Sequence, residues 1–145
     1  MTEEKSTGGC LCGAVMYEAV GEPAYTAHCC CSSCRKASGA DHITLAFYTT
    51  GQVSISGEVA EFGVEADSGN TNYRQFCPAC GSRLFARNSA RENMIGIQAG
   101  TMDQMHGIKP RVVVYASEKR EWDNFNPDLP QFEKMPPPPP PPPAD

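Results

Sequence analysis

The chain has 145 residues, of which 40% are hydrophobic and 20% charged, and this is the size and composition of one soluble globular domain. The net charge is −5 and no run of Lys and Arg stands out, so the basic surface typical of nucleic-acid-binding proteins is missing. No apolar run approaches the roughly 18 residues of a membrane span, and the start MTEEKSTGG lacks the parts of a secretory signal, so the predicted location is the cytoplasm.

The first informative motif is CLC, which places Cys10 and Cys12 two residues apart. In an extended strand, residues i and i+2 face the same side, so both sulfurs can reach one metal ion. Leu11 is then expected to point the other way, into the core. The next stretch, AVMYEAV at 14–20, carries the branched and aromatic residues of a strand.

The sequence HCCCSSCRK forms a second cysteine cluster. Strand alternation groups Cys29 with Cys31, and Cys34 follows at C-x-x-C spacing. Three thiol ligands with a vacant fourth position are typical of a catalytic zinc ion. Alternation turns Cys30 toward the core. As an alternative, His28 fills the fourth position and closes the site.

A short helix is expected directly after this cluster. Ser32 or Ser33 can cap it, and Gly39 ends it after the sequence CRKAS. Two strands are predicted next, HITLAFYT at 42–49 and VSISG at 53–57, because both carry β-branched residues or alternate apolar with polar residues.

A third cysteine motif, CPAC, follows a polar stretch at 64–75 that is predicted to be a flexible surface loop. Cys77, Cys80 and the following Gly81 have the spacing of a zinc knuckle. A closed tetrahedral site needs four ligands, so CPAC is predicted to share one ion with CLC. Four buried free thiols are the alternative. A disulfide framework is disfavoured because the predicted compartment is reducing.

The last predicted strands are MIGIQAG at 94–100 and RVVVYAS at 111–117. Trp122 and Phe125 are expected to fill the core near the C-terminus. Two histidines have no spacing partner and are predicted to be surface or loop residues: His42 and His106.

These elements predict a mainly β domain over residues 8–134, with a flexible N-terminus at 1–7. The folded part is expected to end near Phe132. The segment 135–145 contains eight consecutive prolines and is predicted to be a disordered proline-rich tail of polyproline II character. No role is assigned to it.

Four motifs together resemble one known family: GGCLCGAVMYE, CCCSSCRKASGA, FCPACGSRLF and KREWDNFNPDLPQF. This is the glutathione-dependent formaldehyde-activating enzyme family, which includes centromere protein V. The resemblance implies a β-tent fold of packed antiparallel sheets, with zinc knuckles and two Zn²⁺ ions per chain. It implies a structural ion on Cys10, Cys12, Cys77 and Cys80, and a catalytic ion on Cys29, Cys31 and Cys34.

The resemblance also implies a carbon–sulfur lyase-type enzyme whose partners are glutathione, or a similar thiol, and formaldehyde or another small aldehyde. Arg35 and Lys36 directly follow the second cluster, where they can grip the carboxylates of such a thiol; a solvated helix face is the alternative. The family usually has histidine where this chain has Cys30, and often where it has Val113. A non-catalytic zinc-binding or thiol-carrier module is the alternative function.

Overall fold

The computed structural model describes residues 4–104 and 107–136, and it confirms a mainly β fold with one α-helix among these residues. The prediction for His106 and most of the predicted tail at 135–145 lie outside the described residues. No helix in the described ranges is long and apolar enough to cross a membrane. The elements are β1 (Lys5–Gly9), β2 (Met16–Val20), β3 (Tyr25–Cys29), α1 (Ser32–Ser38), β4 (Ile43–Thr49), η1 (Thr50–Gln52), β5 (Val53–Ser56), β6 (Ala60–Glu65), β7 (Thr71–Phe76), β8 (Arg83–Asn88), β9 (Met94–Gln98), η2 (Ala99–Thr101), β10 (Val112–Val114) and η3 (Ala116–Glu118).

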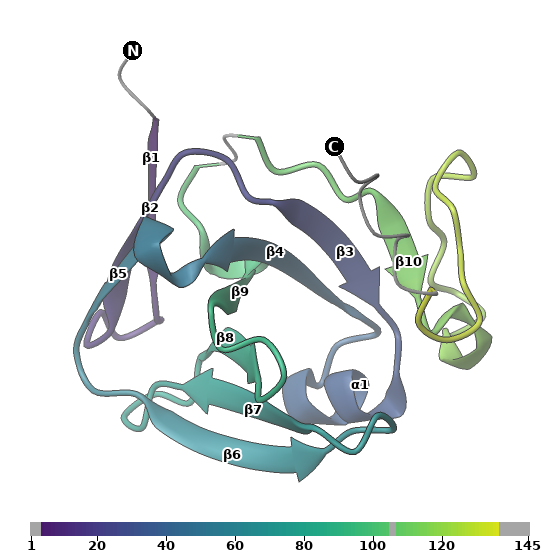
Figure 1. Ribbon diagram of the computed structural model, residues 1–145, viewed down its shortest axis with the longest axis horizontal. Coiled ribbons are helices and arrows are strands. Elements are labelled where there is room, and N and C mark those ends of the chain that lie inside the picture. The colour runs from purple at the N-terminus through teal and green to yellow at the C-terminus, as the bar shows by residue number, and fades with distance from the viewer. Residues whose placement is uncertain (1–3, 105–106, 137–145) are drawn as a thin grey trace, which may run out of the picture.

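The strands form two sheets. The smaller has the order β1-β2-β5, and the larger has the order β10-β3-β4-β9-β8-β7-β6. All neighbouring strands are antiparallel except β10, which runs parallel to β3. In Figure 1 the larger sheet bends, so that its β3–β4 and β6–β7 parts lie on either side of α1. This bend gives the sheet a concave side that holds the helix.

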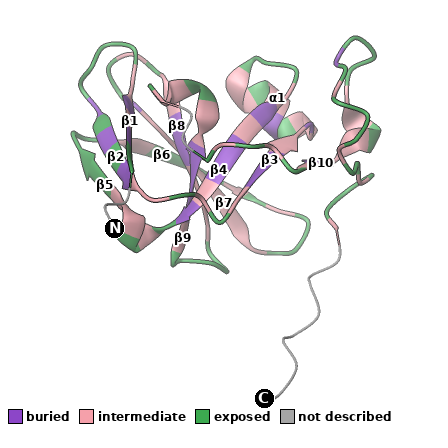
Figure 2. Ribbon diagram, turned by 90° about the horizontal axis from the view of Figure 1, so that it is seen from above, coloured by how far each residue is buried: buried purple, intermediate pink, exposed green. Residues whose placement is uncertain are grey.

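The core lies between the two sheets. Tyr17 from the small sheet packs edge-to-face on Phe85 from the large sheet, with ring centroids 5.4 Å apart. Figure 2 shows buried residues in strands of both sheets and on α1. The fully or almost fully buried residues of this core are Val15, Tyr17, Ala19, Ala46, Tyr48, Cys77, Leu84, Phe85, Ile95 and Ile97.

The predicted helix forms, but its N-cap is Cys31 rather than Ser32 or Ser33. Cys31 has an extended backbone, with φ −61° and ψ 154°, and its Sγ accepts a hydrogen bond from the backbone N–H of Cys34. A thiol thus takes the place of the expected serine hydroxyl. The helix ends at Gly39, as predicted, in a left-handed conformation with φ 73°.

The prediction of a flexible loop over 64–75 is wrong. Strands β6 and β7 pair over this stretch, and the turn between them is closed where the N–H of Ala66 donates to the carbonyl of Asn70 at 2.7 Å. Every residue of β7 is only half-buried, so the strand needs no apolar alternation. Without this alternation, the sequence of β7 resembles that of a polar loop.

The ends of the domain also differ from the sequence prediction. β1 begins at Lys5, inside the stretch 1–7 expected to be flexible, because it pairs with β2 along its whole length. Trp122 is 67% exposed and therefore does not fill the core, while Phe125 is half-buried. The segment after η3 runs back alongside β10, where Val113 forms a parallel bridge with Gln131.

Gly8 in β1 lies close to the side chain of Tyr17 and to the backbone of Thr101. A Cβ at this position would meet the hydroxyl of Tyr17 and, at 2.5 Å, the carbonyl oxygen of Thr101. The Tyr17 hydroxyl also lies 2.7 Å from Thr101 Oγ1, so little movement is possible there. Only glycine fits.

We therefore expect Gly8→Ala to lower the free energy of unfolding by about 2–3 kcal/mol, because the added methyl overpacks a fixed contact. Gly51→Ala is the matched control, since a Cβ at Gly51 would meet no atom within 4 Å. Urea unfolding of both variants measures the difference. Equal stability of the two variants would contradict the close approach at Gly8.

Candidate metal centres

The first cysteine group, which we call the CLC–CPAC cluster, brings four sulfurs together from two distant segments. The Sγ atoms of Cys10, Cys12, Cys77 and Cys80 all lie within 4.8 Å of one another. Cys12 Sγ is 3.7 Å from Cys10 Sγ and 3.8 Å from Cys77 Sγ, although 65 residues separate Cys12 from Cys77. The predicted pairing of CLC with CPAC is therefore present in the fold.

The CLC motif reaches this position by a turn and not by an extended strand. β1 ends at Gly9, and the N–H of Cys10 donates to the carbonyl of Val15 at 3.0 Å. The turn directs the Leu11 side chain outward, where it is 90% exposed, so the expectation that it enters the core is wrong. The backbone N–H of Leu11 instead donates to Ser82 Oγ at 3.0 Å and ties the turn to the knuckle.

The CPAC motif forms a tight turn between β7 and β8. Gly81 has φ +79°, and its N–H donates to the carbonyl of Cys77 at 2.8 Å. The left-handed conformation explains why glycine follows the second cysteine. Hydrogen bonds from the side chain and backbone of Ser82 lower the pKa of the Cys80 thiol to about 5. A stabilised thiolate of this kind is what a metal ion requires of its ligand.

The second group, which we call the Cys29–Cys34 cluster, lies at the junction of β3 and α1. Cys29 is the last residue of β3, Cys31 caps the helix, and Cys34 lies in its first turn. The three sulfurs lie within 4.8 Å of one another, and Cys34 Sγ is 3.6 Å from Cys29 Sγ. Ile43 and Leu45 of β4 pack against the cluster.

The neighbours of this cluster in sequence face elsewhere. Cys30 is fully buried, and its N–H donates to the carbonyl of Val114 at 3.1 Å. His28 Nδ1 is hydrogen-bonded to Thr44 Oγ1 at 2.8 Å, and desolvation, followed by the charge of His42, lowers the pKa of the His28 imidazole. Neither Cys30 nor His28 is part of the group of side chains that can share a metal ion.

The pKa values of the thiols in this cluster are shifted in opposite directions. Hydrogen bonds from the thiols of Cys29 and Cys34, and from the backbone N–H of Cys34, lower the pKa of Cys31 to about 2. Hydrogen bonds with the thiols of Cys31 and Cys34, together with burial, raise the pKa of Cys29 far above its usual value. These shifts favour a thiolate on Cys31 over one on Cys29.

A basic side chain that the sequence analysis missed lies beside this cluster. Arg74 of β7 has its Nη2 atom 3.7 Å from Cys34 Sγ. The candidates from the sequence lie differently: Arg35 Nε donates to the carbonyl of Cys30 at 3.1 Å, and Lys36 is exposed. Arg74 was missed because it falls in the stretch predicted to be a loop. A weak signal in the sequence was the presence of two aromatic residues nearby, Tyr73 directly before Arg74 and Phe76 two residues after it.

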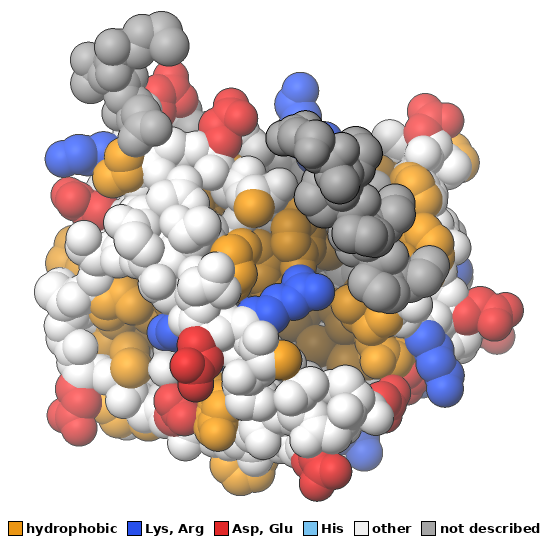
Figure 3. Space-filling model, in the orientation of Figure 1, with side chains coloured by type: hydrophobic (Ala, Val, Ile, Leu, Met, Phe, Trp, Pro, Cys, Tyr) orange, Lys and Arg blue, Asp and Glu red, His pale blue; other side chains and the backbone are white. Residues whose placement is uncertain are grey.

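A small cavity of about 10 Å³ lies beside Cys34, and Arg74, Arg83 and Gln98 are among its lining residues. This volume has room for a group about the size of one water molecule. Figure 3 shows the same side of the molecule as Figure 1, with a hollow lined by hydrophobic side chains and a basic side chain across it. A single ligand atom can thus approach Cys34, while the body of a larger ligand must remain outside the cavity.

His42 lies in the loop between α1 and β4, which agrees with the prediction of a surface or loop residue, but it has a partner that the sequence did not indicate. Its Nδ1 atom lies 2.7 Å from Asp123 Oδ2, and the side chain is 27% exposed. Asp123 lies 81 residues away in the sequence, so the pair could not be predicted from local spacing.

Comparison with known proteins places these two clusters in a family. The family model described as "Glutathione-dependent formaldehyde-activating enzyme" matches residues 5–118. No functionally curated protein matches the chain. A crystal structure of a Rhodobacter sphaeroides protein has a similar fold, with a TM-score of 0.53 and 22% sequence identity over 72% of this chain and 92% of that chain. Since the family match includes both cysteine clusters, the chain belongs to the glutathione-dependent formaldehyde-activating enzyme family.

Proposed function

We propose that this protein is a zinc-dependent carbon–sulfur lyase-type enzyme acting on adducts of glutathione, or a similar thiol, with formaldehyde or another small aldehyde. The Cys29–Cys34 cluster carries the proposal, because it gathers three sulfurs next to a small cavity and a guanidinium group. Family membership supports the choice of thiol and aldehyde. The proposed location is the cytoplasm, where thiols stay reduced.

The sulfur positions fit Zn²⁺. At a Zn–S distance of about 2.3 Å, tetrahedral geometry separates two sulfurs by roughly 3.8 Å. Two of the sulfur separations are 3.7 and 3.8 Å in the CLC–CPAC cluster and one is 3.6 Å in the Cys29–Cys34 cluster, and all pairs in each cluster lie within 4.8 Å. We assign a structural ion to the four sulfurs of the first cluster and a catalytic ion to the three of the second.

When bound, the catalytic ion would keep a substrate thiol in the thiolate form near neutral pH. The chain contributes three thiolates, which leave a net charge of −1 on the loaded cluster. Arg74 lies beside Cys34 and offsets this charge, so that a further anionic sulfur is tolerated. Arg35 and Lys36 are proposed to contact the substrate carboxylates outside the cavity.

The reaction needs one bond to form between sulfur and carbon. The thiolate of the substrate attacks the aldehyde carbon, the carbonyl π electrons move to oxygen, and the oxygen takes a proton from solvent. The product is an S-hydroxymethyl thioether. The reverse reaction breaks the carbon–sulfur bond and returns thiol and aldehyde.

A thiol carrier without turnover is the alternative, and the size of the cavity favours it. A volume of about 10 Å³ does not hold both a sulfur and an aldehyde unless the lining residues move. Glutathione-dependent consumption of formaldehyde that saturates with both compounds would separate the enzyme from the carrier. Tight thiol binding without turnover would establish the carrier.

We expect two zinc ions per chain in freshly purified, reduced protein, because seven cysteines divide into groups of four and three. Elemental analysis by mass spectrometry, together with a thiol titration, measures the ratio. A reproducible value of one ion per chain would remove the catalytic site from the proposal.

We expect the two clusters to differ in their effect on folding. Cys80→Ser should give unfolded or aggregated protein, since the CLC–CPAC ion joins segments 65 residues apart and its binding energy, about 10 kcal/mol or more, is folding energy. Cys34→Ser should stay folded with about one zinc ion and lose thiol-dependent turnover, because its ion closes only a short loop.

Circular dichroism and zinc analysis measure both effects. Cys30→Ser is the matched control, and it should keep both ions at a cost of about 1 kcal/mol, because Cys30 lies outside the sulfur group. The division into structural and catalytic ions fails if Cys34→Ser unfolds as completely as Cys80→Ser, or if Cys30→Ser loses an ion.

We expect Arg74→Gln to lower kcat/KM for the thiol about tenfold, because a charge-assisted contact to sulfur is lost. Arg83→Gln is the control, because Arg83 lines the same cavity but stacks on the ring of Phe76 at 4.8 Å. Steady-state kinetics at several thiol concentrations measure both variants. Equal losses in the two variants would show that Arg74 has no particular role.

A further inference from the structure

A second, larger cavity of about 370 Å³ lies on the opposite side of strands β3 and β4 from the Cys29–Cys34 cluster. His28 and Thr44 are paired in the register of these strands, and they alternate with Cys29 and Ile43, which face the cluster. We call this second space the His42 cavity. Its volume is in the range of small-molecule sites.

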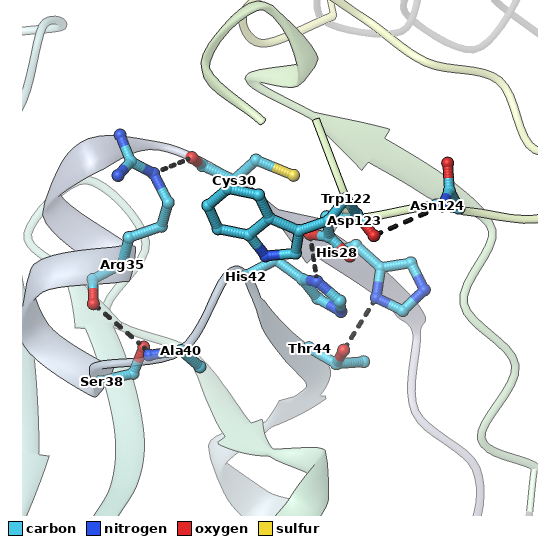
Figure 4. Close-up of polar contacts among 10 residues, drawn as sticks. All are labelled: His28, Cys30, Arg35, Ser38, Ala40, His42, Thr44, Trp122, Asp123 and Asn124. Atoms are coloured by element: carbon cyan, nitrogen blue, oxygen red, sulfur yellow. Dashed lines mark hydrogen bonds and ion pairs between the residues drawn. The ribbon is translucent and has the colours of Figure 1, made fainter. Parts of the chain in front are cut away.

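The histidine that gives the cavity its name is held by a buried carboxylate. Asp123 is the one buried acidic side chain among the described residues, and its Oδ2 atom lies 2.7 Å from His42 Nδ1. A carboxylate accepts the proton on Nδ1, so in its neutral form the His42 imidazole presents the lone pair of Nε2 as a hydrogen-bond acceptor. Figure 4 shows the Asp123 contact on one edge of the His42 ring and His28 beside it, bonded to Thr44.

The walls of the cavity combine apolar and amide groups. The Phe125 ring packs on both imidazoles, with centroid distances of 5.0 Å to His28 and 4.8 Å to His42. Leu129 adds an aliphatic wall, and Asn124 adds a carboxamide. None of the described residues that line the cavity is Lys, Arg, Asp or Glu.

An ion pair that only attached the C-terminal segment to β4 would need no open space next to it. Here the imidazole that Asp123 orients also lines an open cavity, and an aromatic ring lies against it. The cavity lies on the opposite face of β3 and β4 from the Cys29–Cys34 cluster, so it is separate from the cysteine chemistry in space.

We propose that the His42 cavity binds a small uncharged molecule that combines an apolar ring with a hydroxyl or N–H donor, and that this donor bonds to His42 Nε2. The ring occupies the apolar wall of Phe125 and Leu129, and the carboxamide of Asn124 serves a second polar group. Carboxylates and phosphates are disfavoured, because no Lys or Arg is among the described residues that line the cavity. This inference does not depend on the proposed lyase activity.

Phenol is the simplest probe of this chemistry, and anisole and benzoate are its matched comparisons. Anisole replaces the hydroxyl by a methyl ether and so keeps the ring but not the donor, while benzoate carries a charge. We expect phenol to give saturable NMR shift changes at His42 and Phe125 in the zinc-loaded full-length protein. The dissociation constants for anisole and benzoate should each be at least tenfold higher.

His42→Asn tests the acceptor, because the asparagine amide can still donate to Asp123 while Nε2 is removed. It should raise the phenol dissociation constant at least tenfold. Leu129→Phe is a second variant that fills the cavity from a half-buried position without touching the ion pair, and it should have the same effect. Saturating glutathione should leave phenol binding unchanged, because the two sites lie on opposite faces of the sheet.

The proposal is overturned if phenol produces no saturable shifts, or if anisole binds as tightly as phenol. It is also overturned if folded Leu129→Phe binds phenol normally, or if glutathione competes with phenol. Failure of the lyase assay has no bearing on these outcomes, so the two proposals are tested separately.

Discussion

The convergence of four cysteine sulfurs in the CLC–CPAC cluster is the constraint on which the rest of the structure depends. It fixes the turn after β1 to the turn between β7 and β8, and so attaches the small sheet to the large one. Cys77 is itself part of the buried core between the sheets. Four thiols this close together are stable as thiolates around a cation, so the donor chemistry and the sheet packing require the same arrangement.

Alternation along β3 then divides the large sheet into two chemically different faces. Cys29 faces the concave side with α1, while His28 faces the segment that follows η3. Because β3 ends at Cys29 and the helix cap follows at once, the three sulfurs of the second cluster need no distant partner. One short strand thus serves a sulfur site on one face and an imidazole cavity on the other.

The parts of this structure that depend on local spacing could be predicted from the sequence. The CPAC turn, the C-x-C-x-x-C grouping and the helix that ends at Gly39 are set within a few residues. Predictions failed where distant segments decide the outcome. Hydrogen bonding to Ser82 draws Leu11 into a turn, pairing with β6 makes a strand of a polar stretch, and Asp123 reaches His42 across 81 residues.

Strand β7, which the sequence analysis predicted to be a loop, also explains which basic side chain lies beside the Cys29–Cys34 cluster. A residue next to Cys34 in sequence would follow the helix surface, and Arg35 indeed turns back to the carbonyl of Cys30. A cation aimed at the sulfurs must come from the facing part of the bent sheet, and Arg74 of β7 occupies that position. A zinc ion with three thiolates is a weak Lewis acid, because their negative charge offsets its own. In the proposed reaction, charge compensation by Arg74 and close positioning of the reactants would therefore supply much of the rate enhancement.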